Sequence, residues 1–172
     1  MVTFVHIADS CDVKSIRRNG LKLPKKRVRL SENDCFKYGV FALPVTQNFI
    51  ISHQWLRKLK RRGFRTAVGI YFRISDSEAV WAGKYNEKKE ELTAAKAAQV
   101  LMKEEILGYE VVIPRSIKAC EIISIRHLPQ VLGWRHFPNA HGKPPFCGCS
   151  YCQRGNINSR RIRQRYENNV GV

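Results

Sequence analysis

Five short segments rich in β-branched and aromatic residues constrain the fold of this chain more than any other feature of the sequence. These segments are residues 2–6, 38–43, 67–74, 109–113 and 121–125. Each has the length and composition of a β-strand, and the third is the strongest candidate. They do not alternate regularly with helical segments, as strands do in a parallel sheet built from βαβ units. We therefore predict an α+β domain with a mixed or antiparallel sheet.

Three other segments are predicted to be helical. The first follows capping candidates at residues 9–12 and ends at Asn19-Gly20, because glycine readily adopts the left-handed conformation that stops a helix. The second, residues 48–61, has apolar residues near helical spacing and several cations at its C-terminal end, an arrangement that the helix dipole favours. The third, residues 86–103, is predicted from its high content of Ala, Glu, Lys and Leu.

The chain carries a large excess of positive charge. Its 31 Lys and Arg residues oppose 14 Asp and Glu residues, which gives a formal net charge of +17 at pH 7 and a pI near 10.0. Because binding of cations to phosphates releases counterions, nucleic acid is the partner that this charge predicts. An anionic membrane surface is the second candidate, and a basic protein that is merely soluble is the third.

The sequence contains no segment that we expect to enter a membrane. No run approaches the roughly 20 consecutive apolar residues that span a bilayer. Residues 1–6 lack the basic region and the long apolar run of a secretory leader. We therefore expect a cytoplasmic protein with no membrane partner.

Three motifs, in their order along the chain, resemble the ADP-ribosyltransferase superfamily. His6 followed by the Ile-Arg-Arg-Asn-Gly-Leu segment 16–21 is similar to the opening strand and helix of that family. Segment 38–42, Tyr-Gly-Val-Phe-Ala, with the helix that follows it through 51–55, is similar to the second motif. Segment 109–113 is similar to the strand that carries the catalytic glutamate. The resemblance covers about residues 2–125, and it includes the related RNA 2′-phosphotransferases.

The resemblance implies NAD as a substrate and a role for three residues. Glu110 would be the catalytic carboxylate that stabilises an oxocarbenium-like transition state, which such an electrostatic partner can lower in energy. His6 would hold the NAD ribose by hydrogen bonding. Phe41 would stack on the nicotinamide ring, with Tyr38 and Tyr71 as less favoured substitutes.

The sequence departs from the family pattern at two positions. The matched aromatic residue is Phe41 where tyrosine is more typical, and Ile7 follows the histidine where many members have glycine. Glu104 and Glu105 are alternative carboxylates if the register of the third motif differs. Taken one at a time, His6 and Glu110 are also compatible with ordinary surface residues, and Phe41 with core packing.

Residues 129–172 differ in composition from the domain predicted over residues 1–128. They are rich in Gly, Pro, Asn, Arg and Cys and poor in aliphatic residues, so we predict a separate C-terminal extension. Within it, the Cys-x-Cys-x-x-Cys spacing and an upstream histidine allow a Cys₃His zinc site. The ligands would be Cys147, Cys149, Cys152 and His141. Free thiols or a disulfide are the alternatives.

The other three cysteines are scattered through the first domain. Cys11, Cys35 and Cys120 are expected to be free thiols, because disulfides are rare in reducing compartments. Cys120 is predicted to be a small residue of the core.

Two groups of basic residues are candidates for nucleic-acid binding, because clustered cations contact phosphates and interleaved aromatic rings can stack on bases. The first group, in the C-terminal extension, consists of Arg154, Arg160, Arg161, Arg163 and Arg165. The second group, in a basic loop of the first domain, consists of Lys25, Lys26 and Arg27. The helix end at residues 57–62 is a further candidate. A solvated charge cluster or a basic tail without a partner is the alternative interpretation.

These motifs favour an NAD-dependent ADP-ribosyltransferase that acts on nucleic acid. Among the members of the superfamily, the DNA-modifying toxins are the most similar, since they too are small basic domains, and an antitoxin or immunity protein is then a possible partner. An RNA 2′-phosphotransferase is the second enzymatic hypothesis. A zinc-containing nucleic-acid-binding protein without catalytic activity is the hypothesis from a different class.

We predict that the cysteine cluster binds one zinc ion per chain, which native mass spectrometry of the purified protein measures directly. Cys149→Ser should lose the metal together with part of the stability, because metal affinity contributes to the free energy of folding. Cys11→Ser, which changes a cysteine expected to be a free thiol, is the control. Metal-free wild-type protein of full stability would rule out this site.

Overall fold

The structure is a computed structural model that describes residues 1–24, 28–29, 36–61, 66–85 and 87–128. All of these residues belong to the unit Met1–Leu128. Several sequence candidates lie outside the described residues. They are Lys25, Lys26, Arg27, Cys35, His141, Cys147, Cys149, Cys152, Arg154, Arg160, Arg161, Arg163 and Arg165.

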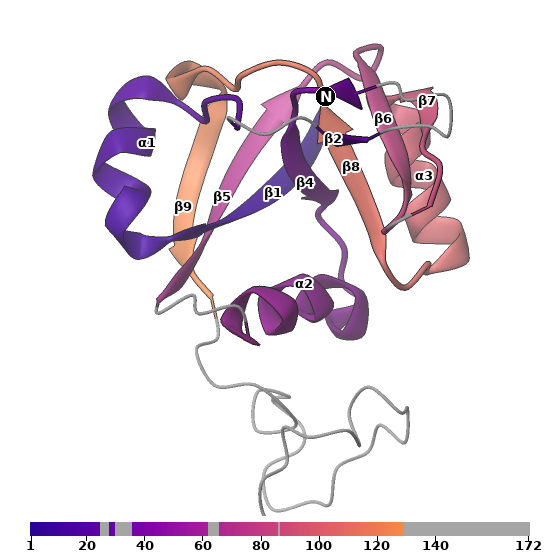
Figure 1. Cartoon of the computed structure of the whole chain (residues 1–172), viewed down its shortest axis with the longest axis horizontal. Coiled ribbons are helices and arrows are strands. Elements are labelled where there is room, and N and C mark those ends of the chain that lie inside the picture. The colour runs from indigo at the N-terminus through magenta and orange to yellow at the C-terminus, as the bar shows by residue number, and fades with distance from the viewer. Residues whose placement is uncertain (25–27, 30–35, 62–65, 86, 129–172) are drawn as a thin grey trace, which may run out of the picture. The chain divides into compact units, whose positions relative to one another are not determined.

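The described residues form an α+β fold around a seven-stranded sheet with the order β7-β6-β8-β4-β1-β5-β9 (Figure 1). The strands are β1 (Val2–Asp9), β4 (Val40–Pro44), β5 (Ala67–Ile74), β6 (Ala79–Lys84), β7 (Glu90–Thr93), β8 (Tyr109–Ile113) and β9 (Ile122–His127). Every neighbouring pair in this sheet is antiparallel. A separate two-stranded ladder joins β2 (Val28–Arg29) to β3 (Phe36–Lys37). The predicted α+β class is thus confirmed, and the sheet is antiparallel.

The helices connect strands of the sheet. They are α1 (Val13–Asn19), α2 (Phe49–Arg61) and α3 (Ala94–Glu104), with the short 3₁₀ turns η1 (Ser10–Asp12) and η2 (Ala119–Glu121). In Figure 1, α3 lies beside β6 and β7, and α2 lies below the strands. The first two predicted helices are confirmed, and the first one ends at Asn19, as its glycine stop indicated.

The third predicted helix, residues 86–103, is wrong in its first half. Glu90–Thr93 form β7, which pairs with β6 from Ala79↔Thr93 to Ala82↔Glu90. The helix begins only at Ala94, where the Thr93 hydroxyl caps it by accepting a hydrogen bond from the Lys96 N–H at 3.3 Å. Sheet pairing and this cap outweigh the helix propensity of Glu and Lys, which is a weak preference.

The core is formed by side chains from both halves of the sheet. Phe4 of β1 lies opposite Phe72 of β5 in the strand register, and their rings stack at a centroid distance of 6.1 Å. Tyr109 is also buried, and its hydroxyl donates to the Ala97 carbonyl of α3 at 2.9 Å. Burial raises the pKa of Tyr109 to about 12, so the hydroxyl remains a donor throughout the physiological range. α3 is thereby fixed to the centre of the sheet.

The cysteines in the described part of the chain correct one expectation. Cys11 and Cys120 are both free, as predicted. Cys120 is exposed, however, and is not a core residue. It lies in η2, a single turn at the surface with no buried residues, so the apolar residues on either side of it in the sequence do not carry it into the core.

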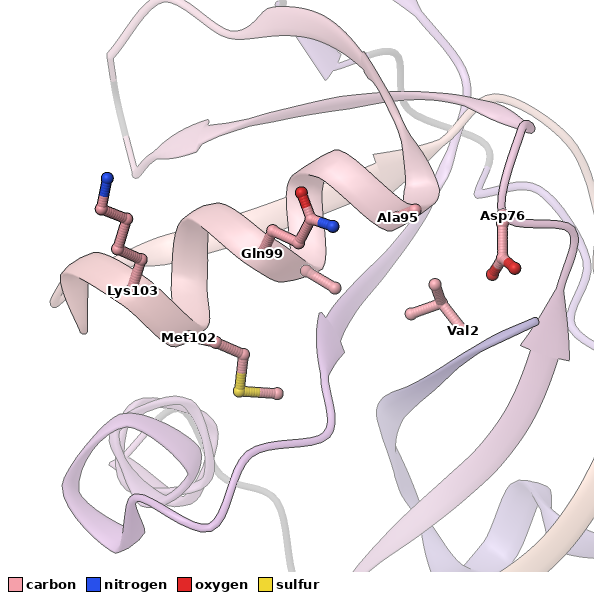
Figure 2. A pocket seen from close by; sticks show the side chains of 7 residues that line it. Val2, Asp76, Ala95, Gln99, Met102 and Lys103 are labelled. Atoms are coloured by element: carbon pink, nitrogen blue, oxygen red, sulfur yellow. The ribbon is translucent and has the colours of Figure 1, made fainter.

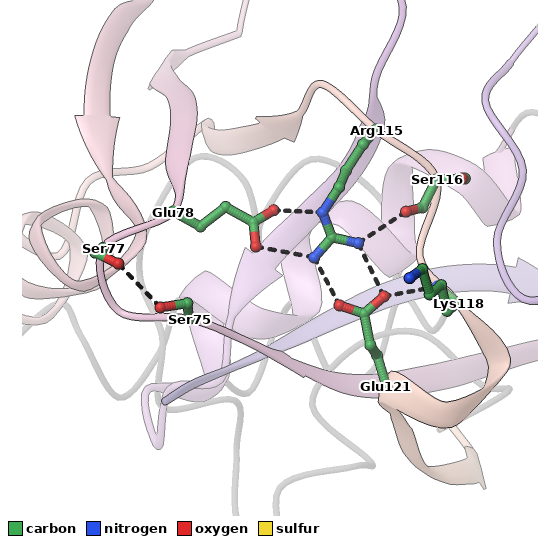
Figure 3. Close-up of polar contacts among 7 residues, drawn as sticks. All are labelled: Ser75, Ser77, Glu78, Arg115, Ser116, Lys118 and Glu121. Atoms are coloured by element: carbon green, nitrogen blue, oxygen red, sulfur yellow. Dashed lines mark hydrogen bonds and ion pairs between the residues drawn. The ribbon is translucent and has the colours of Figure 1, made fainter.

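A charged network joins the segment after β8 to the segment before β6 (Figure 3). The Arg115 guanidinium lies between two carboxylates and makes two bonds with each, at 2.7 and 2.8 Å to Glu78 and at 2.6 and 2.8 Å to Glu121. Its hydrogen bonds lower the pKa of Glu121. The stabilisation is therefore present above the ordinary glutamate pKa of about 4.3 and is lost as the pH falls through the lowered value.

Gly20 occupies a position that only glycine fits. Its φ is 72°, and a Cβ atom built on it would lie 1.9 Å from the carbonyl oxygen of Ile117, because residue 21 forms a β-bridge with that residue. Gly108 has a similar φ of 82°, but its nearest neighbour would lie at 3.8 Å. A side chain at residue 20 would therefore meet both backbone strain and steric overlap, whereas one at residue 108 would meet strain alone.

We expect Gly20→Ala to lower the free energy of unfolding by about 3 kcal/mol, since left-handed backbone strain and overpacking add. Gly108→Ala is the matched control and should lose only about 1–2 kcal/mol from strain alone. Urea denaturation of both variants measures the difference. Equal losses would contradict the close approach of Gly20 to Ile117.

Candidate active site

A cavity of about 530 Å³ lies where β1 and β4 separate. The two strands pair only at Phe4↔Pro44 and Val5↔Leu43, whereas β1 pairs with β5 along its whole length. Beyond Val5, the β1 residues as far as Asp9 line the cavity. The other walls come from β4, β8, α1, α2 and the residue that follows β6. The break in sheet pairing therefore coincides with a concave site near the centre of the described sheet.

Three of the predicted site residues lie together in this cavity. His6 of β1, Phe41 of β4 and Glu110 of β8 all line it, although they are far apart in the sequence. The resemblance assigned these three residues to one site, and the strand order β8-β4-β1 places their strands side by side.

The other predicted aromatic residues do not reach the cavity. Tyr38 is exposed and lies before β4, and Tyr71 lies on β5 with the Arg126 guanidinium 5.3 Å from its ring centroid. Neither lines the cavity, so of the three predicted aromatic residues only Phe41 belongs to the site. The alternative carboxylates Glu104 and Glu105 are exposed at the end of α3 and do not line it either.

His6 bridges the gap between the separating strands. Its Nδ1 lies 2.7 Å from the carbonyl oxygen of Phe41. A carbonyl can only accept, so Nδ1 carries the proton and donates. Burial lowers the pKa of His6, although the bond with Phe41 and the charge of Asp12 oppose that effect. The ring is therefore neutral at pH 7, and its Nε2 is left as a hydrogen-bond acceptor.

Glu110 is a buried carboxylate on an interior strand, and not the solvated edge residue that its position at the start of a strand allows. Its Oε1 lies 2.8 Å from the Lys89 Nζ, and the two side chains are only 10% and 3% exposed. The same Nζ donates to the Lys84 carbonyl at 3.2 Å. A buried charge is very costly unless it is paired and hydrogen-bonded, so Lys89 makes the burial of Glu110 possible.

Gly83 allows Lys89 to approach Glu110. It lies opposite Glu110 in the register of β6 and β8. A Cβ atom at this position would lie 2.9 Å from the Lys88 carbonyl oxygen and 3.3 Å from the Lys89 Cα. Sequence reasoning missed Lys89 because it lies in a run of charged residues that we interpreted as the first part of a helix. The only signal in the sequence is the glycine in a segment with strand-like residues.

A second group of residues forms another part of the cavity wall, and sequence reasoning did not assign its two aromatic members to a site. We name Trp55, Lys58 and Tyr85 the Trp55–Lys58–Tyr85 cluster. The two aromatic rings meet edge to face with centroids 5.7 Å apart. The Lys58 Nζ lies 3.0 Å from the Tyr85 ring centroid and 5.3 Å from that of Trp55. Such cation–π contacts are favourable, and they hold the lysine over the rings.

The helix end at residues 57–62 is not a uniform cationic surface. Arg57 is only 2% exposed, and Lys58 lies over the aromatic rings of the cavity. Arg57 is therefore not exposed for a phosphate contact, and the other residues of this helix end stay candidates for one. Burial on α2 is not limited to one side, since Ile51, Leu56 and Arg57 point in different directions around the helix and are all nearly fully buried.

A second cavity of about 630 Å³ lies between α3 and the start of β1 (Figure 2). Val2 and Asp76 lie on one side of it, and Gln99 and Met102 of α3 lie on the other. It contains none of the predicted site residues and no cluster of titratable groups.

The described residues contain no group of three or more His, Cys, Asp or Glu side chains arranged to hold a metal ion. None of the described helices combines the length and the apolar character that crossing a membrane requires.

Comparison with known proteins adds no further constraint: no protein-family model, no curated protein and no solved structure matches this chain. The chemistry of the site therefore rests on its own geometry. It combines a neutral imidazole acceptor, a buried carboxylate paired with a lysine, and aromatic rings open to a cavity of the size that holds small molecules.

We expect Lys89→Met to lower the free energy of unfolding by about 3–5 kcal/mol, because it leaves the Glu110 carboxylate buried without its cation. Lys89→Met combined with Glu110→Leu should recover most of the loss, since an apolar pair of similar volume often replaces a buried ion pair at little cost. Denaturant unfolding measures both variants.

Lys88→Met is the matched control for the Lys89→Met variant. Lys88 precedes Lys89 and is exposed, so its replacement should change the free energy of unfolding by no more than about 0.5 kcal/mol. Equal losses for the two single lysine variants would mean that the Lys89–Glu110 pair does not stabilise the fold.

Proposed function

We propose that this chain is an NAD-dependent ADP-ribosyltransferase that modifies nucleic acid, and that its sheet and helices form an ADP-ribosyltransferase-like core. One observation carries the proposal. His6, Phe41 and Glu110, which the resemblance assigned to one NAD site, line a single cavity. Three residues picked from short motifs along 105 positions, between 6 and 110, would not be expected to meet by chance.

The chemistry of each residue fits its role in glycosyl transfer from NAD. The neutral His6 has an Nε2 lone pair that can accept a hydrogen bond from a ribose hydroxyl. The exposed ring of Phe41 can stack on the nicotinamide ring. Glu110 supplies a negative charge that is held in a fixed position before any positive charge develops on the ribose.

Lys89 pairs with one oxygen of the Glu110 carboxylate and leaves the other oxygen available to a ligand. The ammonium group contacts Oε1 at 2.8 Å. A carboxylate has about four lone-pair sites, so the other oxygen keeps the capacity to accept from a ribose hydroxyl. The ion pair thus orients the carboxylate, and it prevents the side chain from turning away from the cavity.

Nucleic acid as the acceptor is supported by the net charge of +17. A protein with so large a positive charge attracts phosphates over long distances. The arginines of the C-terminal extension and the zinc site predicted beside them would then anchor the acceptor, and an antitoxin or immunity protein remains a partner that the toxin resemblance implies.

Incubation with NAD labelled in its ADP-ribose part, together with separate DNA, RNA and protein pools, tests the proposal. We expect label to appear in a nucleic-acid pool with release of nicotinamide. Label in the protein pool alone would mean that the acceptor is a protein and not a nucleic acid. Removal of a 2′-phosphate from RNA would favour the phosphotransferase hypothesis. Nucleic-acid binding without any NAD turnover would favour the hypothesis of a non-catalytic nucleic-acid-binding protein.

We predict that Glu110→Gln lowers the rate of ADP-ribose transfer by roughly 10²–10³, the usual effect of removing one preorganised electrostatic partner. Initial rates with labelled NAD measure the change. Glu104→Gln is the control, because Glu104 is an exposed glutamate outside the cavity and should leave the rate unchanged.

The glutamine variant leaves Lys89 buried beside a neutral amide, so stability must be followed in parallel. If Glu110→Gln unfolds, the double variant with Lys89→Met removes the unpaired cation and tests the same loss of charge. A folded variant of either kind with wild-type turnover would refute the role of Glu110.

A further inference from the structure

The Trp55–Lys58–Tyr85 cluster is fixed to the strand that carries Glu110. The Trp55 indole N–H donates to the Tyr109 carbonyl at 2.8 Å. The Tyr85 backbone N–H donates to the Gly108 carbonyl at 2.8 Å. Both anchors lie within two residues of Glu110, so the Trp55 ring and the backbone of Tyr85 are tied to the strand that carries the carboxylate.

Glu110 lies between this cluster and the residues proposed to hold NAD. In the sheet, β8 lies between β4, which carries Phe41, and β6, which leads into Tyr85. A group transferred at Glu110 would therefore have the NAD side of the cavity on one flank and the aromatic cluster on the other. Transfer between two substrates needs two subsites that meet at the reacting carbon.

We propose that the Trp55–Lys58–Tyr85 cluster is the subsite for an unpaired nucleobase of single-stranded nucleic acid. The Tyr85 ring provides the face on which the base stacks, and the Lys58 ammonium contacts a neighbouring phosphate. The position of this subsite as the acceptor site rests on the function proposed above, whereas the binding itself does not require catalysis.

The contact energies allow the base to replace Lys58 on the ring. In the free protein, the Lys58 Nζ lies over Tyr85 at 3.0 Å. A cation–π contact at such a partly exposed site is worth about two- to fivefold in an equilibrium constant. Stacking of a base on an aromatic side chain is worth about five- to 150-fold. The base can therefore displace the lysine, whose charge becomes available to the phosphate that accompanies the base.

The geometry favours an unpaired base over a duplex. The rings line the wall of a cavity. Bases in a duplex have their faces covered by neighbours, so a base must leave the stack to reach such a wall. Aromatic rings beside a cation are also the usual elements of single-strand binding sites.

Tyr85→Leu tests the stacking with two fluorescent probes, a single-stranded oligonucleotide and an oligonucleotide of the same length with abasic sites. We expect about five- to 150-fold weaker binding of the first probe and unchanged binding of the second. Tyr38→Leu is the matched control, because Tyr38 is 39% exposed against 37% for Tyr85 and lies outside the cavity. Tyr85→Phe keeps the ring and should bind like the wild type.

Lys58→Met tests the phosphate contact on the full chain. The slope of log affinity against log salt should flatten by about 0.7 on the single-stranded probe, the amount expected for one contact. Lys103→Met, at the exposed end of α3, should leave the slope unchanged. Equal slopes for all three proteins would overturn the role of Lys58.

The same variants separate this proposal from the proposed function. The nucleobase subsite would be overturned if Tyr85→Leu binds both probes like the wild type. It would also be overturned if the substitution weakens NAD binding and leaves oligonucleotide binding unchanged. Dependence of binding on Tyr85 in a protein that never consumes NAD would support the subsite and refute the transferase. Transfer of ADP-ribose by Tyr85→Leu with the wild-type KM for the nucleic acid would support the transferase and refute the subsite.

Discussion

The short pairing between β1 and β4 is the constraint on which the site depends. Only two residue pairs join these strands, and the sheet would close without a cavity if the pairing continued to Asp9. The His6 ring crosses the gap and bonds to the Phe41 carbonyl at 2.7 Å. One side chain thus satisfies a backbone acceptor that would otherwise need a partner strand, and it faces the cavity with its other nitrogen.

The charges of the site follow from this opening. Glu110 lies on an interior strand where water is largely excluded, and Lys89 compensates its charge from a segment that Gly83 allows to approach. The low exposure strengthens every electrostatic interaction in the cavity. A carboxylate held in this way is suited to stabilise positive charge on a ligand, because it needs little rearrangement when that charge develops.

Much of the site was predictable because its residues lie on regular strands. His6, Phe41 and Glu110 each belong to a segment whose apolar pattern indicates a strand, and their order matched a family resemblance. Lys89 and Tyr85 were not predictable in the same way. They lie in a charged segment after β6 whose composition favours a helix, and only the pairing of β6 with β7 and β8 determines where their side chains lie.

By itself, the sequence determined the α+β class, most of the strands, the glycine stop of α1 and the positive charge, because each depends on local composition and periodicity. The tertiary structure alone decided the strand order, the burial of Arg57 and the exposure of Cys120. It also decided which charged side chain pairs with Glu110. These features depend on contacts between residues distant in the chain, and the balance of desolvation against pairing at each contact is set only when the sheet has formed.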